Sequence, residues 1–115
     1  MEEIARIYSQ SLFEAAVDRD KVDQIKAELT TFTQAVDTSE DLRLFLFSPY
    51  FSGEEKRDGL ARIIEDSSPE FLNFVQLLAE KHRLPAIHRV QAHYEKLWAE
   101  HYKLLPVTVT IAVEL

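Results

Sequence analysis

The chain has 115 residues, a net charge of −7 and no cysteine. This length suits one domain with a buried core, and the lack of cysteine excludes disulfides and thiolate metal sites. No run of more than two consecutive Lys or Arg residues occurs, so no nucleic-acid partner is expected. No apolar run approaches the roughly 20 residues that span a bilayer, so no direct membrane insertion is expected.

Two amphipathic helices are predicted at the start of the chain, over residues 2–18 and 21–36. Apolar side chains recur in both at steps of three and four, which is the helical period. In the first helix these are Ile4, Tyr8, Leu12 and Ala15; in the second they are Val22, Ile25, Leu29, Phe32 and Val36. The second helix has a polar back, as expected of a helix that packs one face on a core.

Two capping signals predict the next helices. The sequence TSED at 38–41 is expected to open a short helix over 42–47, which Ser48-Pro49 ends. The aromatic segment 49–51 is expected to pack against the bundle. Ser52 and Glu55 have capping-box spacing, and they open a helix whose inward residues are expected to be Leu60, Ile63 and Ile64.

Capping and charge signals also predict the last two helices. Ser68 is the expected cap of the fifth helix, with proline at its first position. Lys81, His82 and Arg83 place cations near its carbonyl end. After a corner at 84–85, the sixth helix continues to about residue 103 with one apolar side. The predicted fold is an all-α, compact bundle of about six helices in a domain of residues 1–104.

The end of the chain reads differently. Within residues 104–115, LLPVTVTIAVEL, the apolar Val107, Val109, Ile111 and Val113 alternate with Thr108, Thr110, Ala112 and Glu114. This period of two, mostly in β-branched residues, predicts a β-strand. A single strand leaves its backbone groups unpaired and is not stable alone. We expect residues 105–115 to begin a second, sheet-containing domain that is missing here; the alternative is a frayed tail.

The fifth helix is unusually apolar. Phe71, Phe74, Val75 and Leu78 form one stripe, which Leu77 and Lys81 extend on one flank, and Leu72 and Ala79 on the other. The apolar arc is about 220° wide, whereas a surface helix shows little more than 100°. Two interpretations stay open: a central helix of the bundle, or a helix that also meets a partner.

The first helix raises a similar question. Ala5, Leu12 and Ala16 can face inward, whereas Ile4, Tyr8, Ser11 and Ala15 lie on an adjoining arc. Small residues at Ser11 and Ala15 beside Tyr8 would leave a shallow trough, which suits an amphipathic partner helix. Ordinary small core residues would give the same pattern.

No arrangement of residues typical of an enzyme is found. His93 and His101 lie two turns apart, about 12 Å along a helix, too far to share a metal. His88 and His93 are five residues apart and point to different sides of their helix. With two glycines in the chain, a glycine-rich phosphate loop is absent. The sequence therefore predicts a binding protein with no catalytic residues, no metal and no cofactor.

Three segments resemble one protein family. ARIYSQSLFEAA (5–16), FLNFVQLLAEKHRLPAI (71–87) and LLPVTVTIAVEL (104–115) resemble, in order and spacing, segments of the δ subunit of F-type ATP synthase, called OSCP in mitochondria. The chain departs from the family pattern at a few places. Ser9 and Ser11 stand where the family often has alanine, His82 where glycine or asparagine is frequent, and Glu114 where proline is common.

The resemblance implies a non-catalytic adaptor in the stator, or peripheral stalk, which keeps the catalytic head from turning with the rotor during proton-driven ATP synthesis. An N-terminal helix of an α subunit would lie between the first and fifth helices, and the missing C-terminal domain would join the b subunit of the stalk. The first residues look like neither a signal nor a transit peptide. The expected location is therefore the cytoplasmic face of a bacterial membrane, as a peripheral part of the synthase complex.

The arcs of the two helices, taken with this resemblance, define the expected binding groove. The groove is expected to be lined by Ile4, Tyr8, Ser11, Ala15, Phe74 and Leu77, with Asn73 and Lys81 at its rim. The alternative is a small helical dimerisation or regulatory module that uses the same surface with a second copy of itself.

Overall fold

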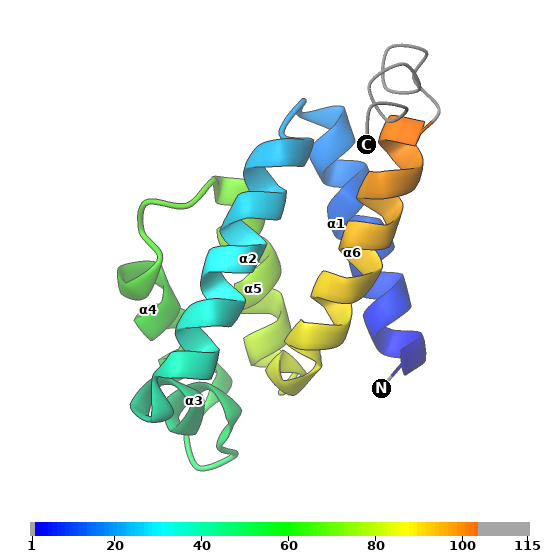
Figure 1. Ribbon diagram of the computed structural model, residues 1–115. Coiled ribbons are helices and arrows are strands. Elements are labelled where there is room, and N and C mark those ends of the chain that lie inside the picture. Colours follow the sequence, from blue (N-terminus) through cyan, green and yellow to red (C-terminus); the bar gives the residue numbers. More distant parts are fainter. Residues whose placement is uncertain (1, 104–115) are drawn as a thin grey trace.

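A computed structural model describes residues 2–103 of the chain (Figure 1). In chain order the elements are α1 (Glu2–Asp18), α2 (Val22–Thr38), α3 (Glu40–Phe47), α4 (Gly53–Ile63), α5 (Pro69–Glu80), the 3₁₀-helix η1 (Leu84–Ala86) and α6 (Ile87–Lys103). The predicted all-α bundle of about six helices is confirmed for this part of the chain. The strand predicted within 105–115 lies outside the described residues, and the boundary at 104 stays a prediction.

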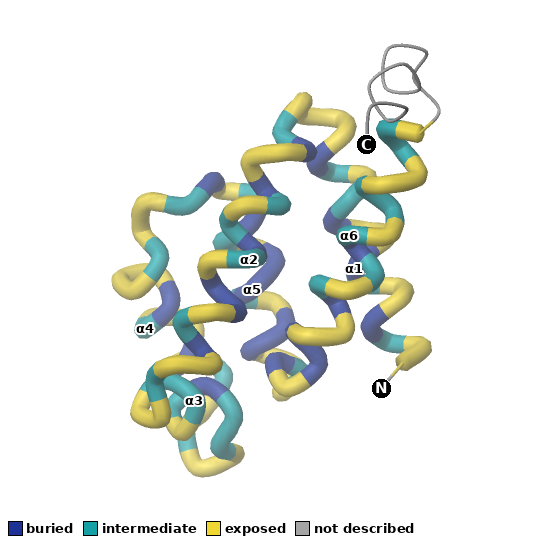
Figure 2. The backbone as a smooth tube through the Cα atoms, viewed as in Figure 1, coloured by how far each residue is buried: buried dark blue, intermediate teal, exposed yellow. Residues whose placement is uncertain are grey.

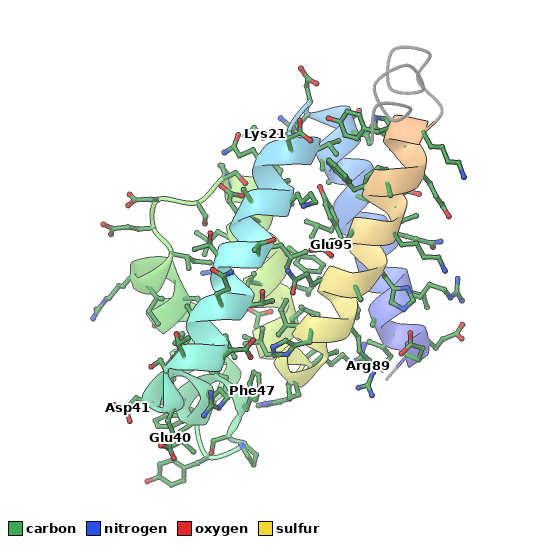
Figure 3. The ribbon with its side chains drawn as sticks, viewed as in Figure 1. Lys21, Glu40, Asp41, Phe47, Arg89 and Glu95 are labelled. Atoms are coloured by element: carbon green, nitrogen blue, oxygen red, sulfur yellow. The ribbon has the colours of Figure 1, made fainter. Side chains whose placement is uncertain are left out.

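The fifth helix contacts α1, α2, α4 and η1. The first helix packs along α6 in the same direction, and α4 packs against α5. In Figure 1, α2 crosses in front of α5, and α3 lies at the end of the bundle away from the carboxyl end of α6. Arg89 of α6 lies beside the start of α1 (Figure 3), and its Nε is 3.3 Å from Glu2 Oε1. The starts of α1 and α6 are thus neighbours.

The core runs along the inner faces of the helices (Figure 2). It takes in Ala5, Leu12 and Ala16 of α1, Ile25, Leu29, Phe32 and Val36 of α2, Phe71, Val75 and Leu78 of α5, and Ile87, Val90 and Tyr94 of α6. These are the residues that the helical period places inward on each helix. Helical periodicity therefore predicted most of the core.

Each predicted serine cap forms. Ser39 accepts a hydrogen bond from the Leu42 amide at 3.2 Å and starts α3. Ser52 forms a complete capping box with Glu55 at the start of α4, and Ser68 caps α5. Such caps satisfy amides that the first turn of a helix leaves free.

Two helices end on a non-glycine residue in the left-handed region. Asp20 has φ of 58° and His82 has φ of 56°. After each, an amide bonds back five residues: Lys21 N to Ala16 O and Arg83 N to Leu78 O, both at 2.8 Å. This is the bond of a Schellman motif, which normally has glycine at the left-handed position.

Two expectations about side-chain packing were wrong. Ile63 is 48% exposed, and only Leu60 of the three predicted inward residues of α4 is fully buried. The α2 residues that share a pocket with Ile63, including Ala27 and Ala35, are too small to cover it. In the aromatic loop, Phe51 packs on Phe45, but Tyr50 is 86% exposed.

Candidate partner-binding surface

The first and fifth helices lie side by side and run in opposite directions. The rings of Tyr8 and Phe74 meet edge to face, with their centroids 6.3 Å apart. At the carboxyl end of α5, Arg83 Nη1 donates to the Tyr8 hydroxyl at 3.0 Å. The guanidinium carbon also lies 5.8 Å from the Tyr8 ring centre, within cation–π range. The predicted residues Tyr8 and Phe74 therefore form one unit, which Arg83 holds in place.

We call the outward surface of these two helices the α1–α5 surface; its predicted members are Ile4, Tyr8, Ser11, Ala15, Asn73, Phe74, Leu77 and Lys81. Ile4, Tyr8 and Ala15 are half-buried, and Ser11, Asn73 and Lys81 are exposed. Leu77 leaves 40% of its side chain exposed. By contrast, Phe74 is 8% exposed. Its ring packs against Tyr8 and leaves little of its own surface for a partner.

Most of the wide apolar arc of α5 is covered inside the bundle. Phe71, Val75, Leu78 and Ala79 are buried, and Leu72 is half-buried. The interpretation of α5 as a central helix therefore accounts for nearly all of its apolar residues. Leu77 is the large apolar side chain of α5 that the bundle leaves open to solvent.

Sequence reasoning missed two residues of this surface. Ile7 is 52% exposed, and it lies three residues after Ile4 and four before Ser11, so helical spacing alone could have included it. The role of Arg83 had no such signal, because its contact with Tyr8 joins residues 75 positions apart. Ile7 and Leu77 are the large exposed apolar groups that the two helices contribute here.

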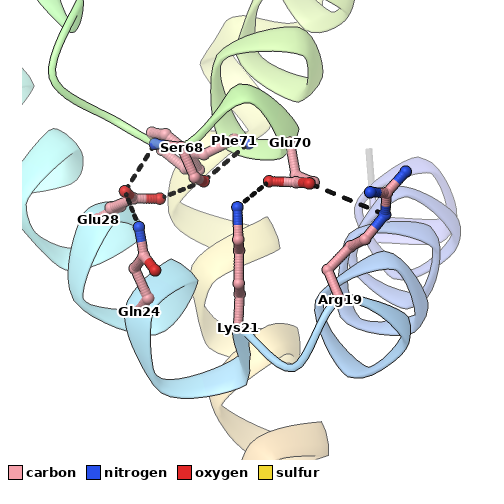
Figure 4. A network of polar contacts seen from close by, with 7 residues as sticks. All are labelled: Arg19, Lys21, Gln24, Glu28, Ser68, Glu70 and Phe71. Carbon is pink, nitrogen blue, oxygen red and sulfur yellow. Dashed lines mark hydrogen bonds and ion pairs between the residues drawn. The ribbon is translucent and has the colours of Figure 1, made fainter.

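Charged groups hold α5 where the α1–α2 turn passes its first turn (Figure 4). Lys21 Nζ lies 3.0 Å from Glu70 Oε1, and Arg19 Nε lies 3.9 Å from Glu70 Oε2. The hydrogen bond from Lys21, with the Glu70 backbone amide and the charges of Lys21 and Arg19, lowers the pKa of Glu70. Through these contacts Glu70 ties the first turn of α5 to the turn between α1 and α2.

The described residues 2–103 contain no cluster of three His, Cys, Asp or Glu residues able to hold a metal ion. Over the same residues, no helix combines the length and apolar character needed to cross a bilayer. The α1–α5 surface presents the exposed apolar side chains of Ile7 and Leu77, with Lys81 as an exposed charged group.

The fold matches a chain in the cryo-EM structure of the Polytomella F-ATP synthase, refined on the F1 head and rotor, in rotary substate 2C. The TM-score is 0.79 with 21% sequence identity, over 84% of this chain and 87% of that chain. A chain in substate 2A of the same assembly matches with a TM-score of 0.78. The described residues thus have the helical fold of a chain from that assembly.

The sequence comparisons identify the family. The family model described as ATP synthase delta (OSCP) subunit matches residues 4–115. The chain is 31% identical over 108 residues to ATP synthase subunit delta of Rubrobacter xylanophilus, and 34% identical over 106 residues to that of Lysinibacillus sphaericus. These matches cover 94% and 92% of this chain but 60% of each relative. The chain belongs to the ATP synthase delta (OSCP) family, and it spans about 60% of the length of those relatives.

Proposed function

We propose that this chain is the N-terminal part of a non-catalytic stator subunit of an F-type ATP synthase. In this role it links the catalytic head to the peripheral stalk and so supports proton-driven ATP synthesis. The observation that carries the proposal is the family match over residues 4–115. The bacterial relatives, all named as subunit delta, support a place on the cytoplasmic face of a bacterial membrane.

The proposed partner is an amphipathic helix at the N-terminus of an α subunit, bound on the α1–α5 surface. Support comes from the exposed side chains of Ile7 and Leu77, and from the contact between the Tyr8 and Phe74 rings that joins the two helices. A visiting helix would cover these groups with its apolar face, and its binding would come mainly from burial of that apolar area. Ser11 and Ala15 are small, so they let its backbone approach closely.

We extend the proposal to the rest of the protein. The relatives are long enough for a second domain, which would begin within residues 105–115 and join the b subunit of the stalk. The length of the natural open reading frame tests whether a second domain follows. Its binding to the b subunit is tested by an assay with and without the sequence after residue 104.

Calorimetric titration tests the α-helix proposal. The chain is titrated with a peptide of the α-subunit N-terminus from the same genome. We expect saturable binding with a negative heat-capacity change, the mark of apolar burial. Leu77→Asp should weaken binding at least about tenfold, because a charge would replace apolar contact area. Leu44→Asp is the matched control, since Leu44 is 59% exposed but lies on α3.

Two results would contradict the proposal. One is a folded chain that gives no heat with the peptide, and the other is Leu77→Asp binding as tightly as the unaltered chain. Sedimentation of the chain alone separates the rival function, self-association through the same surface. In that case the mass rises with concentration, and Leu77→Asp returns it to that of a monomer.

A further inference from the structure

A pocket of about 380 Å³ opens on a different part of the bundle, between α2, α3 and the segment that joins α4 to α5. Its lining is mostly apolar and comprises Ala27, Phe32, Ala35, Leu42, Ile63, Ile64 and Phe71, with Glu28, Thr31, Asp66 and Ser67 as the polar members. Small-molecule sites have this size and this mixture of apolar walls with few polar groups. Nothing in the proposed stator function uses the pocket.

The shape of the pocket follows from residue sizes. Ala27, Thr31 and Ala35 succeed each other at steps of four along α2, so one side of the hollow is a row of small side chains. Phe32 and Phe71 are both buried and meet edge to face with centroids 5.9 Å apart, forming its floor. A floor of packed aromatic rings does not collapse to fill the hollow.

Among the described residues, the lining of the pocket carries two carboxylates, Glu28 and Asp66, and no cationic side chain. Figure 4 shows the Glu28 carboxylate accepting hydrogen bonds from the Ser68 amide and hydroxyl, both at 2.8 Å, and from the Gln24 amide group at 3.2 Å. These donors fix the carboxylate in place, but all are neutral. Within residues 2–103 neither Glu28 nor Asp66 forms an ion pair.

We propose that this pocket binds a small amphipathic cation, with an apolar body against Phe32, Ala35 and Ile63 and an ammonium or similar head near Glu28 and Asp66. The apolar walls favour burial of a hydrocarbon body. The two carboxylates attract a cation and repel an anion, and this effect is strengthened next to an apolar surface. The exposed Ile63 is then explained as one wall of the site.

Titration with simple probes tests the proposal, followed by amide chemical shifts of the ¹⁵N-labelled 115-residue chain. The probe is the n-octylammonium ion at pH 7, and its matched probe is octanoate, with a chain of equal length and opposite charge. We expect saturable shifts centred on Ala35, Ile63 and Ile64. Octylammonium should bind about tenfold more tightly than octanoate, because charge is the main difference between the probes.

Substitutions identify the site. Ala35→Leu fills the hollow from the partly exposed side of α2, so it should weaken octylammonium binding at least about tenfold while helicity is kept. Ala92→Leu is the matched control, because Ala92 is an exposed alanine on α6, and it should leave binding unchanged. Asp66→Asn should reduce the preference for the cation over octanoate.

Three outcomes would overturn the proposal. They are equal affinity for the two probes, unchanged binding in Ala35→Leu, and shifts that centre on Ile7 and Leu77 instead. Peptide binding to the α1–α5 surface is measured in the same Ala35→Leu protein. Because it should be unaffected there, the pocket and the stator proposal can fail independently.

Discussion

Tyr94 joins α6 to the start of α2, and removal of its hydroxyl should have a measurable cost. The side chain is fully buried, and its hydroxyl donates to the Val22 carbonyl at 2.8 Å. Its ring also meets the Phe13 ring edge to face, with centroids 5.5 Å apart. Burial raises the pKa of Tyr94, which disfavours ionisation of its hydroxyl further still. Tyr94→Phe therefore removes one buried hydrogen bond and keeps the ring.

The size of the effect follows from that single bond. A buried neutral hydrogen bond contributes about 1 kcal/mol net, with a range of about 0.5–1.5 kcal/mol. The ring contact with Phe13 is retained, so no large cavity term is added. For a domain of this size, a loss of about 1 kcal/mol lowers the thermal midpoint by about 4 °C.

Urea unfolding followed by circular dichroism measures the loss, and a thermal scan gives the midpoint. Tyr50→Phe is the matched control, because it removes the same hydroxyl from a side chain that is 86% exposed, and it should leave stability unchanged. A loss below about 0.3 kcal/mol in Tyr94→Phe, or an equal loss in both variants, would refute the assignment of stability to this bond.

Four other substitutions should change stability in stated directions, each measured by urea unfolding. Lys56→Met should stabilise the chain most at low pH, up to the lowered folded-state pKa, because burial lowers the pKa of Lys56 and the protonated amine is disfavoured in the folded state. Asp23→Asn should destabilise it at neutral pH but not in acid. Ser68→Ala should cost about 1–2 kcal/mol, because it removes the cap of α5 and a donor to Glu28. His82→Asn should gain about 0.5 kcal/mol, because asparagine tolerates positive φ better.

The pH dependence of the Lys56→Met and Asp23→Asn effects follows from the difference in proton binding between the folded and unfolded states. The unfolded state keeps the Lys56 proton up to its ordinary pKa of 10.5, so the advantage of Lys56→Met should shrink as pH rises toward that value. Hydrogen bonds from Trp98 and Tyr102 lower the pKa of Asp23 below 3.8. Its contribution is complete above 3.8 and is lost as pH falls through the lower folded-state pKa. A pH-independent difference in either case would contradict the stated cause.

The predictions for Ser68→Ala and His82→Asn can each be contradicted by a specific result. Ser52→Ala removes an exposed cap and should cost less than Ser68→Ala, whose hydroxyl also bonds across to α2. Equal costs would show that the bond to Glu28 contributes nothing. For His82→Asn, a loss of stability would mean that the His82 ring makes contacts worth more than the backbone strain.

Local signals in the sequence predicted the elements well. A serine before a helix acts within one turn, so Ser39, Ser52 and Ser68 could be assigned from their immediate neighbours. The α1–α2 turn shows where such signals end. Asp20 takes a conformation that favours glycine, and no capping or periodic pattern in the neighbouring sequence predicts it.

The candidate surface was predicted less completely, since it depends on which neighbours cover each side chain. A helical wheel placed Phe74 and Leu77 on adjoining parts of one arc. In the structure Tyr8 packs on Phe74, whereas the described residues leave 40% of the Leu77 side chain exposed. The same limitation explains Ile63, whose exposure is set by the small residues of α2. Periodicity shows which side of a helix is apolar, but not how much of that side a neighbouring element covers.

The carboxyl end of α6 is fixed to α2 in a way that suits the proposed stator role. Asp23 accepts hydrogen bonds from Trp98 Nε1 and from the Tyr102 hydroxyl, each at 2.8 Å, and Lys26 lies 4.8 Å from the Trp98 ring centre. The sequence continues from this end toward residue 104 and beyond. An adaptor that resists torque must pass load between its parts without bending. In the proposed role, a force on α6 would be transmitted to α2 through the hydrogen bonds of Asp23, and to α1 through the ring contacts of Phe13. These contacts would keep the last turns of α6 from unwinding under that force.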